Sequence, residues 1–112
     1  MWLHDTARRA VVPFEPGVVV RLYTCGITPY DATHLGHAAT YVTFDVLQRR
    51  LADRGHEVRY VRNITDVDDD MLRAARRRGI HHRDLAFGVI RRFDDDMAAL
   101  GKLPPWAEPR AS

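Results

Sequence analysis

The chain has 112 residues, 46% of them hydrophobic and 29% charged, which is the composition of a globular domain with one modest core. Seventeen lysines and arginines against 15 acidic residues leave a net charge of +2, too balanced to indicate nucleic-acid binding by charge alone. No apolar run has membrane-spanning length, the start lacks a signal-peptide pattern, and a single cysteine, Cys25, excludes an internal disulfide. We therefore expect a cytoplasmic protein without a membrane partner.

The first part of the chain predicts a small hairpin followed by a strand. Apolar residues at position 3 and over 10–12 flank a polar turn over residues 5–9. Two prolines and a glycine over 13–17 then predict a loop. The β-branched run 18–23 predicts a short buried strand that breaks at the next glycine.

A second strand and three helices are expected in the remaining sequence. Residues 34–54 carry an apolar stripe wide enough to pack on a sheet, and Gly55 predicts the end of this helix. Residues 57–62 alternate between polar and apolar and predict a strand parallel to the first, because a helix connects the two. Two further helices are predicted over residues 66–78 and 83–100. The expected fold class is α/β, a parallel sheet flanked by helices, with the small hairpin in front of it.

The acidic run after the second strand has an ordinary structural explanation. Thr65 and Asp68 form a capping-box-like pair, and the aspartates over 66–70 suit the positive start of a helix. The arginines over 73–78 suit the negative end of the same helix. This pattern does not require a metal site.

The sequence between the first strand and the first helix is the most informative stretch. Cys25 and Gly26 are followed by Pro29 and then by His34-Leu-Gly-His37 at the predicted helix start. A polar, glycine-containing loop that opens a helix is the usual place for a phosphate-bearing ligand in an α/β fold, because the helix start offers free N–H groups. The two histidines share one side of the first turn, where they can equally donate to phosphate oxygens or bind zinc. We predict a nucleotide site here.

The end of the second strand is expected to face the same site. The carboxyl ends of neighbouring parallel strands meet at one edge of a sheet, so residues 63–65 should lie beside the Cys25 loop. A lone cysteine at a strand end is more often a packed thiol than a ligand. The pattern alone therefore gives Cys25 no functional role.

Two long motifs carry a family resemblance. They are Cys25-Gly-Ile-Thr-Pro-Tyr-Asp-Ala-Thr-His-Leu-Gly-His-Ala-Ala-Thr-Tyr41 and Tyr60-Val-Arg-Asn-Ile-Thr-Asp-Val-Asp-Asp69. Together they closely resemble the class I cysteinyl-tRNA synthetases and their relative, the mycothiol-pathway ligase that joins cysteine to glucosaminyl-inositol. Residues 27–30 and 37–41 are more similar to the mycothiol ligase, whereas 62–65 and 108–111 are more similar to the synthetase. The acceptor, tRNA or glucosaminyl-inositol, stays open.

The resemblance implies a HUP-type Rossmann domain that binds ATP and cysteine and forms cysteinyl-adenylate and pyrophosphate. His34 and His37 would be the catalytic residues, which stabilise charge on the phosphates rather than transfer protons. Cys25 would be one of four zinc ligands, and the metal would grip the substrate thiolate. The nucleotide-binding residues implied are Gly26, Ile27, Thr28, His34, Gly36, His37 and Thr40. Those implied to contact cysteine or the adenylate are Cys25, Thr28, Asn63, Ile64 and Thr65.

Other parts that the resemblance implies have no counterpart in this sequence. These are the family's other three zinc ligands and its lysine-bearing Lys-Met-Ser-Lys-Ser loop. Zinc is thus expected in the family but not from this chain's own ligands, and the isolated chain is expected to be inactive or to need a second part. A sheet with so few strands should expose an unpaired edge and an apolar face. A shortened chain, a split enzyme with a second protein chain, or a homo-oligomer would each account for this.

One domain is expected over residues 1–103, the N-terminal part of a class I synthetase-like nucleotide-binding domain, with a linker or tail over 104–112. Two other functions stay open. One is a non-catalytic half-synthetase that binds its ligands without turnover, which the missing lysine loop favours. The other is a small stand-alone nucleotidyltransferase, against which the two cysteine-activator motifs argue.

Overall fold

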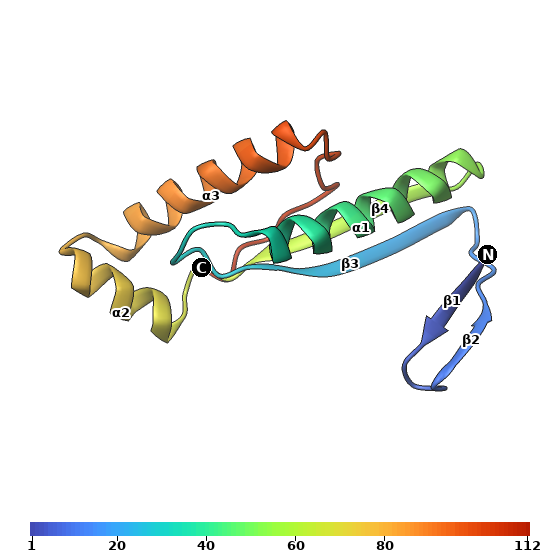
Figure 1. Ribbon diagram of the computed structural model, residues 1–112, viewed down its shortest axis with the longest axis horizontal. Coiled ribbons are helices and arrows are strands. Elements are labelled where there is room, and N and C mark those ends of the chain that lie inside the picture. Colours follow the sequence, from blue (N-terminus) through green and yellow to red (C-terminus); the bar gives the residue numbers. More distant parts are fainter.

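The computed structural model describes residues 1–112 (Figure 1). Its elements in chain order are β1 (Trp2–Asp5), β2 (Ala10–Pro13), β3 (Val19–Ile27), α1 (Leu35–Asp53), β4 (Glu57–Ile64), α2 (Asp69–Arg78) and α3 (His82–Ala99). β1 and β2 form an antiparallel hairpin, and β3 pairs with β4 in parallel. The predicted fold class is confirmed. No helix combines the length and the apolarity that crossing a bilayer requires.

The molecule is elongated, with extents of 51 × 30 × 25 Å. The hairpin projects from one end, beside the start of β3, while the carboxyl ends of β3 and β4 point to the opposite end, where α2 lies (Figure 1). The hairpin is therefore remote from the strand ends at which the ligand site is expected.

β3 is longer than predicted, because it passes through Cys25 and Gly26 and ends at Ile27. The expectation that the strand breaks at Gly26 is wrong. The register is irregular between Thr24, which pairs with Arg62, and Ile27, which pairs with Ile64. The pairing of β3 with β4 thus resumes at Ile27. A Cβ at Gly26 would lie 1.4 Å from the carbonyl oxygen of Asn63, so only glycine allows this close approach.

Residues 104–112, expected as a linker or tail, run along β4 on the side away from β3 (Figure 1). The backbone N–H of Arg62 donates to the carbonyl of Ala107 (3.2 Å), and that of Ile64 donates to the carbonyl of Pro109 (2.9 Å). The tail thus covers one edge of the β3–β4 pair. The other edge, formed by β3, has no strand partner.

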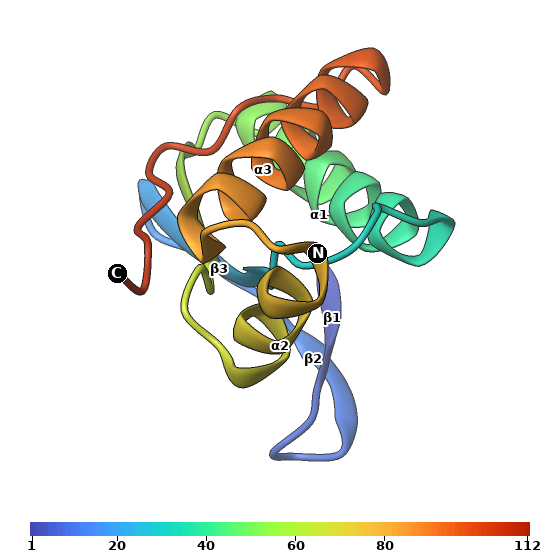
Figure 2. The ribbon, with the colours of Figure 1, turned by 90° about the vertical axis from the view of Figure 1, so that its left-hand side faces the viewer.

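Two helices cover one face of the β3–β4 pair and leave the other open. α1 and α3 lie on the same side of the strands (Figure 2), where Tyr41 of α1 packs edge to face on Phe93 of α3 with ring centres 5.2 Å apart. The opposite face exposes Tyr23 and Trp106, at 59% and 64% of their surface. Two buried clusters form the core: Ile64, Met71, Ala74, Ala75, Leu85, Ala86 and Ile90 in one, and Ile27, Tyr41, Phe93 and Met97 in the other.

α2 starts three residues later than predicted. Its N-cap is Asp68, whose carboxylate accepts a backbone N–H two residues further on (2.8 Å). The expected start at residue 66, with Thr65 as the capping residue, is wrong. The Thr65 hydroxyl instead accepts from the Asn63 amide (3.2 Å), and Asp66 is held by hydrogen bonds from the last residue of the tail. Thr65 is therefore tied to the strand end and Asp66 to the tail, and neither caps the helix.

Candidate functional site

The two histidines of the predicted nucleotide site cap the first turn of α1. His34 is the N-cap residue, and its Nδ1 accepts the backbone N–H of Gly36 (3.1 Å). The Nδ1 of His37 accepts the backbone N–H of His34 (3.3 Å), so the two side chains form a capping box made of imidazoles. Their ring centres lie 3.9 Å apart.

This capping arrangement determines the tautomer of each ring. Because Nδ1 accepts a backbone N–H in both histidines, each neutral ring carries its proton on Nε2. Partial burial, together with the neighbouring His34, lowers the pKa of His37. The helix start therefore presents Nε2–H groups that can donate to an anion, next to the positive end of the helix dipole.

Gly36 and Thr40 complete this turn. A Cβ at Gly36 would lie 2.9 Å from the His34 ring, so the cap leaves no room for a side chain at this position. The hydroxyl of Thr40 donates to the Gly36 carbonyl (3.0 Å), which leaves its oxygen free to accept. Gly36 is thus part of the histidine cap.

Asn63 joins the ends of β3 and β4. Its Oδ1 accepts from the Gly26 backbone N–H and from the Tyr23 hydroxyl, both at 2.9 Å. Its Nδ2 donates to Thr65 Oγ1 (3.2 Å), and the backbone N–H of Thr65 donates to the carbonyl of Ile27 (3.0 Å). The structure therefore brings residues 25–27 and 63–65 together at one edge, as the parallel pairing requires.

A single hydrogen bond connects the histidine turn to this strand edge. The hydroxyl of Tyr41, one turn after His37, donates to the Cys25 carbonyl (3.2 Å). Burial raises the pKa of Tyr41 to about 12, so its hydroxyl keeps its proton and can donate. The Cys25 side chain itself is exposed.

Not every residue of the predicted site can offer its side chain to a ligand. Ile27 and Ile64 are buried in the two core clusters, so their side chains are not offered to a ligand. The N–H and the carbonyl of Ile64 bond to the tail, and the Ile27 carbonyl accepts the N–H of Thr65. Thr28 is half-buried in the loop that leads to α1, and its carbonyl accepts the N–H of Tyr30 (2.9 Å).

The residues present do not form a metal site by themselves. No group of three or more histidine, cysteine, aspartate or glutamate side chains is arranged to hold an ion. Tetrahedral zinc sites take three or four protein ligands, whereas Cys25 stands alone at the strand edge. Zinc is therefore not accounted for by this chain's own residues.

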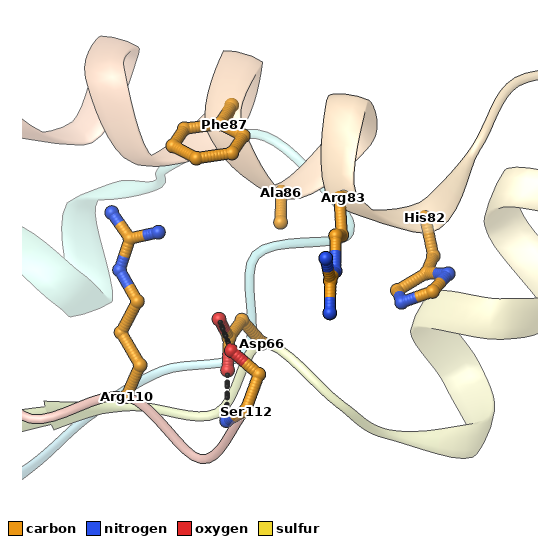
Figure 3. A pocket seen from close by; sticks show the side chains of 7 residues that line it. All are labelled: Asp66, His82, Arg83, Ala86, Phe87, Arg110 and Ser112. Carbon is orange, nitrogen blue, oxygen red and sulfur yellow. Dashed lines mark hydrogen bonds between the residues drawn. The ribbon is translucent and has the colours of Figure 1, made fainter.

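Two pockets lie next to the candidate site. One, of about 430 Å³ and mostly apolar, opens between the start of α1 and the end of α3, with His34, Leu35, Met97 and Leu100 in its wall. The other, of about 300 Å³, has Asp66, the residue after Thr65 in the chain, in its wall (Figure 3). Figure 3 shows its polar lining: Asp66 from the loop after β4, His82 and Arg83 from α3, and Arg110 and Ser112 from the tail.

Sequence reasoning missed the buried residues that support this edge. Arg62 and Asn63 are neighbours in β4, so their side chains lie on opposite faces of the strand. The Arg62 side chain lies on the covered face, where it is 3% exposed. The sequence held a signal: Val58 and Tyr60 mark one face of this strand as apolar, and Arg62 falls on the same face, where a buried arginine needs a partner. Glu108 supplies that partner from the tail, which was expected to be a linker.

Comparison with known proteins agrees with the motifs. The family model for the catalytic domain of class I (C) tRNA synthetases matches residues 11–112. The L-cysteine:1D-myo-inositol 2-amino-2-deoxy-α-D-glucopyranoside ligase of Gordonia bronchialis is 61% identical over 103 residues, and those of Nocardia farcinica and Mycobacterium tuberculosis are 57% identical over the same length. Each match covers 92% of this chain and 25% of the relative. The chain thus spans about a quarter of the length of the curated relatives that it matches.

A solved structure supports the same assignment. The LeuRS of Agrobacterium radiobacter K84, in a ternary complex with tRNA and LeuAMS, matches with a TM-score of 0.69 and 26% identity. The match covers 80% of this chain and 12% of the LeuRS chain. Motifs, fold and family model therefore agree, and the chain belongs to the family of class I (C) tRNA synthetase catalytic domains.

Proposed function

We propose that this chain forms the ATP- and cysteine-binding part of a cysteine-activating ligase. In the first step, a carboxylate oxygen of cysteine attacks the α-phosphorus of ATP, and pyrophosphate leaves. The cysteinyl group then passes from the adenylate to an acceptor. The observation that carries the proposal is the imidazole capping box of His34 and His37, one turn before the tyrosine that holds Cys25.

The two histidines are the proposed catalytic residues. Their Nε2–H groups would donate to the phosphate oxygens on which charge builds up during in-line attack, and the N–H groups of the helix start would add to this stabilisation. Because both rings accept a backbone N–H through Nδ1, they are poised as donors and not as general bases. The apolar pocket beside His34 fits a flat ring such as adenine.

The remaining assignments follow the strand edge. We propose that the backbone of Gly26, Ile27 and Thr28, together with Gly36 and Thr40, borders the nucleotide. Cys25, Asn63, Ile64 and Thr65, with Thr28, would border the cysteine or the adenylate. Cys25 would also be one ligand of a zinc ion, with the other ligands supplied from outside this chain.

The acceptor is proposed from the relatives. The ligases at 57–61% identity are named for an inositol-linked amino sugar, whereas the family model is named for tRNA synthetases. We favour the amino sugar, because the pocket after Thr65 is lined by carboxylate, guanidinium and hydroxyl groups, which suit a small polyol. A tRNA 3′ end remains the alternative acceptor.

Two other functions compete with this proposal. A non-catalytic binding module would bind the same ligands without turnover, and the family's absent lysine loop favours it for the isolated chain. A small nucleotidyltransferase would bind ATP without any preference for cysteine. The hydrogen bond that ties Asn63 to Gly26 of β3 favours a site that extends beyond the nucleotide.

Calorimetry with three ligands tests the proposal: ATP, AMP and a non-hydrolysable cysteinyl-adenylate analogue. We expect the analogue to bind more tightly than AMP, because its cysteinyl part would reach the Cys25–Asn63 edge. Equal affinities for the analogue and AMP would favour the nucleotidyltransferase. Absence of binding by all three would refute a nucleotide site in this chain.

A further inference from the structure

The interior holds a charged side chain for which the proposed chemistry has no use. Arg62 lies where β4, α1, α3 and the tail meet, and its side chain is 3% exposed. Its Nε donates to Glu108 Oε2 (2.5 Å), and its Nη2 donates to the same oxygen and to Asp94 Oδ1 (3.3 Å). A buried guanidinium without such partners would be strongly unfavourable, so the tail residue Glu108 is what makes this arginine tolerable.

Arg62 also supports a pair of aromatic rings. Its guanidinium carbon lies 4.5 Å from the ring centre of Phe93 and 5.5 Å from that of Tyr41. The two rings pack edge to face on each other, and both are buried. Cation–π attraction and ring packing therefore act together on the position of Tyr41.

The hydroxyl of Tyr41 meets β3 at its irregular point. It donates to the carbonyl of Cys25, which falls between Thr24 and Ile27, the part of β3 that has no partner in the register with β4. Tyr41 thus supplies a hydrogen bond where the regular ladder does not. The adjacent N–H, that of Gly26, is the one that donates to Asn63.

We propose that Tyr41 and Arg62 are positioning residues for the cysteine-binding end of the site. Glu108 fixes Arg62, Arg62 fixes the Tyr41 ring, and the Tyr41 hydroxyl fixes the main chain of Cys25 beside Asn63. This inference rests on the proposed function, because it concerns how that end of the site is held. It gives the tail a role in a site formed by β3 and β4.

A single carbonyl resonance tests the proposal. Cys25 is the only cysteine, so labelling with [1-13C]cysteine marks one carbonyl in the whole chain. Tyr41→Phe removes the hydroxyl and keeps the ring. Tyr60→Phe is the matched control, because Tyr60 is equally buried and loses one hydrogen bond, to Thr24 (2.7 Å), which does not involve Cys25.

We expect the Cys25 carbonyl resonance to shift in Tyr41→Phe and to stay in place in Tyr60→Phe. Affinity for the cysteinyl-adenylate analogue should fall about three- to tenfold in Tyr41→Phe only, the equivalent of one hydrogen bond. An unmoved resonance in Tyr41→Phe overturns the proposal. So does a shifted resonance with unchanged affinity, or an equal loss of affinity in the two variants. If the unmodified chain does not bind the analogue while the resonance still shifts, the proposed function fails and the positioning of Cys25 stands.

A second pair of variants tests the role of the tail without removing the buried arginine. Glu108→Gln keeps the size of the side chain and removes its charge, whereas Asp94→Asn makes the same change at a partner of Arg62 that is 52% exposed. We expect Glu108→Gln to shift the Cys25 carbonyl in the same direction as Tyr41→Phe, and Asp94→Asn to leave it in place. An unmoved resonance in Glu108→Gln would overturn the part assigned to the tail.

Discussion

At the scale of single residues, His34 and His37 cap the first turn of α1 and, in the proposed function, also supply donors to an anion. A helix start needs acceptors for its free N–H groups, and an anion site needs donors. An imidazole can do both, because one ring nitrogen accepts while the other donates. In this chain each Nδ1 accepts a backbone N–H, so each Nε2–H is left for a ligand.

The first prediction concerns ligand binding by these rings. His37→Ala should weaken the binding of ATP or of the adenylate analogue by about 1–3 kcal/mol, because a donor to a charged oxygen is lost. Calorimetry measures this loss. His81→Ala is a matched control, since His81 caps α3 in the same way, through Nδ1 and the Arg83 N–H (3.2 Å), and is not among the proposed nucleotide-binding residues. Unchanged affinity in His37→Ala would refute the role of His37.

The second prediction concerns protonation. Burial and the neighbouring His34 lower the pKa of His37 from the ordinary value of 6.5, so an NMR titration of its ring should give a value below 6.5. The folded chain then binds fewer protons than the unfolded chain between the lowered pKa and 6.5. The contribution of His37 to stability should therefore be complete above pH 6.5 and decline as the pH falls through that window. A pKa above 6.5 would contradict the capping geometry.

At the scale of elements, the sequence predicted the type of every helix and strand but not where some of them end. β3 continues past Gly26 because a residue without a Cβ lets β3 and β4 come close at this point. In the sequence alone, such a glycine looks the same as a glycine that ends a strand. α2 starts late because Thr65 and Asp66 bind Asn63 and the tail, both contacts that depend on tertiary structure. The histidine turn was predictable, since its motif is local. The Arg62–Glu108 pair could not be predicted in this way, because its two residues are 46 positions apart in the sequence.

The third prediction tests why glycine occupies position 26. Gly26→Ala should destabilise the chain by about 3 kcal/mol or more, because the new methyl group meets the backbone of Asn63 and β3 must move away from β4. Urea unfolding measures the change. Gly88→Ala in α3 is the control: its Cβ would meet nothing within 4 Å, so it should stabilise the helix by about 0.5–1 kcal/mol. Equal stability of Gly26→Ala and the unmodified chain would contradict the close approach.

At the scale of the whole molecule, the sheet is covered on one side only. The open face of β3 and β4 carries a hollow of about 460 Å³, lined by Arg21, Leu22, Tyr23, Arg59, Val61 and Trp106. The β3 edge beside it has no strand partner. An uncovered apolar face next to a free edge favours association with another chain or with a second copy of this one.

The fourth prediction concerns the isolated chain in solution. We expect a dimer or larger assembly in light scattering at low micromolar concentration, and little zinc in metal analysis, because one thiolate does not hold zinc tightly. Cys25 should react readily with a thiol reagent. Trp106→Arg on the open face should shift the chain toward the monomer, whereas Phe87→Arg, an exposed aromatic on α3, should not. Stoichiometric zinc in a clean monomer would contradict both expectations.

The central claim is that this chain supplies the ATP- and cysteine-binding part of a cysteine-activating ligase, and cysteine-dependent ATP–pyrophosphate exchange tests it most directly. The chain should be assayed alone and as a chimera in which it replaces the corresponding quarter of the Gordonia bronchialis ligase, which is 61% identical over the matched region. We predict little or no exchange by the chain alone, because the charge-stabilising lysines that the resemblance implies lie outside it. The chimera should show exchange that requires cysteine and is lost in His34→Ala and His37→Ala. Robust exchange by the 112-residue chain alone, or a folded chimera without any exchange, would contradict the account.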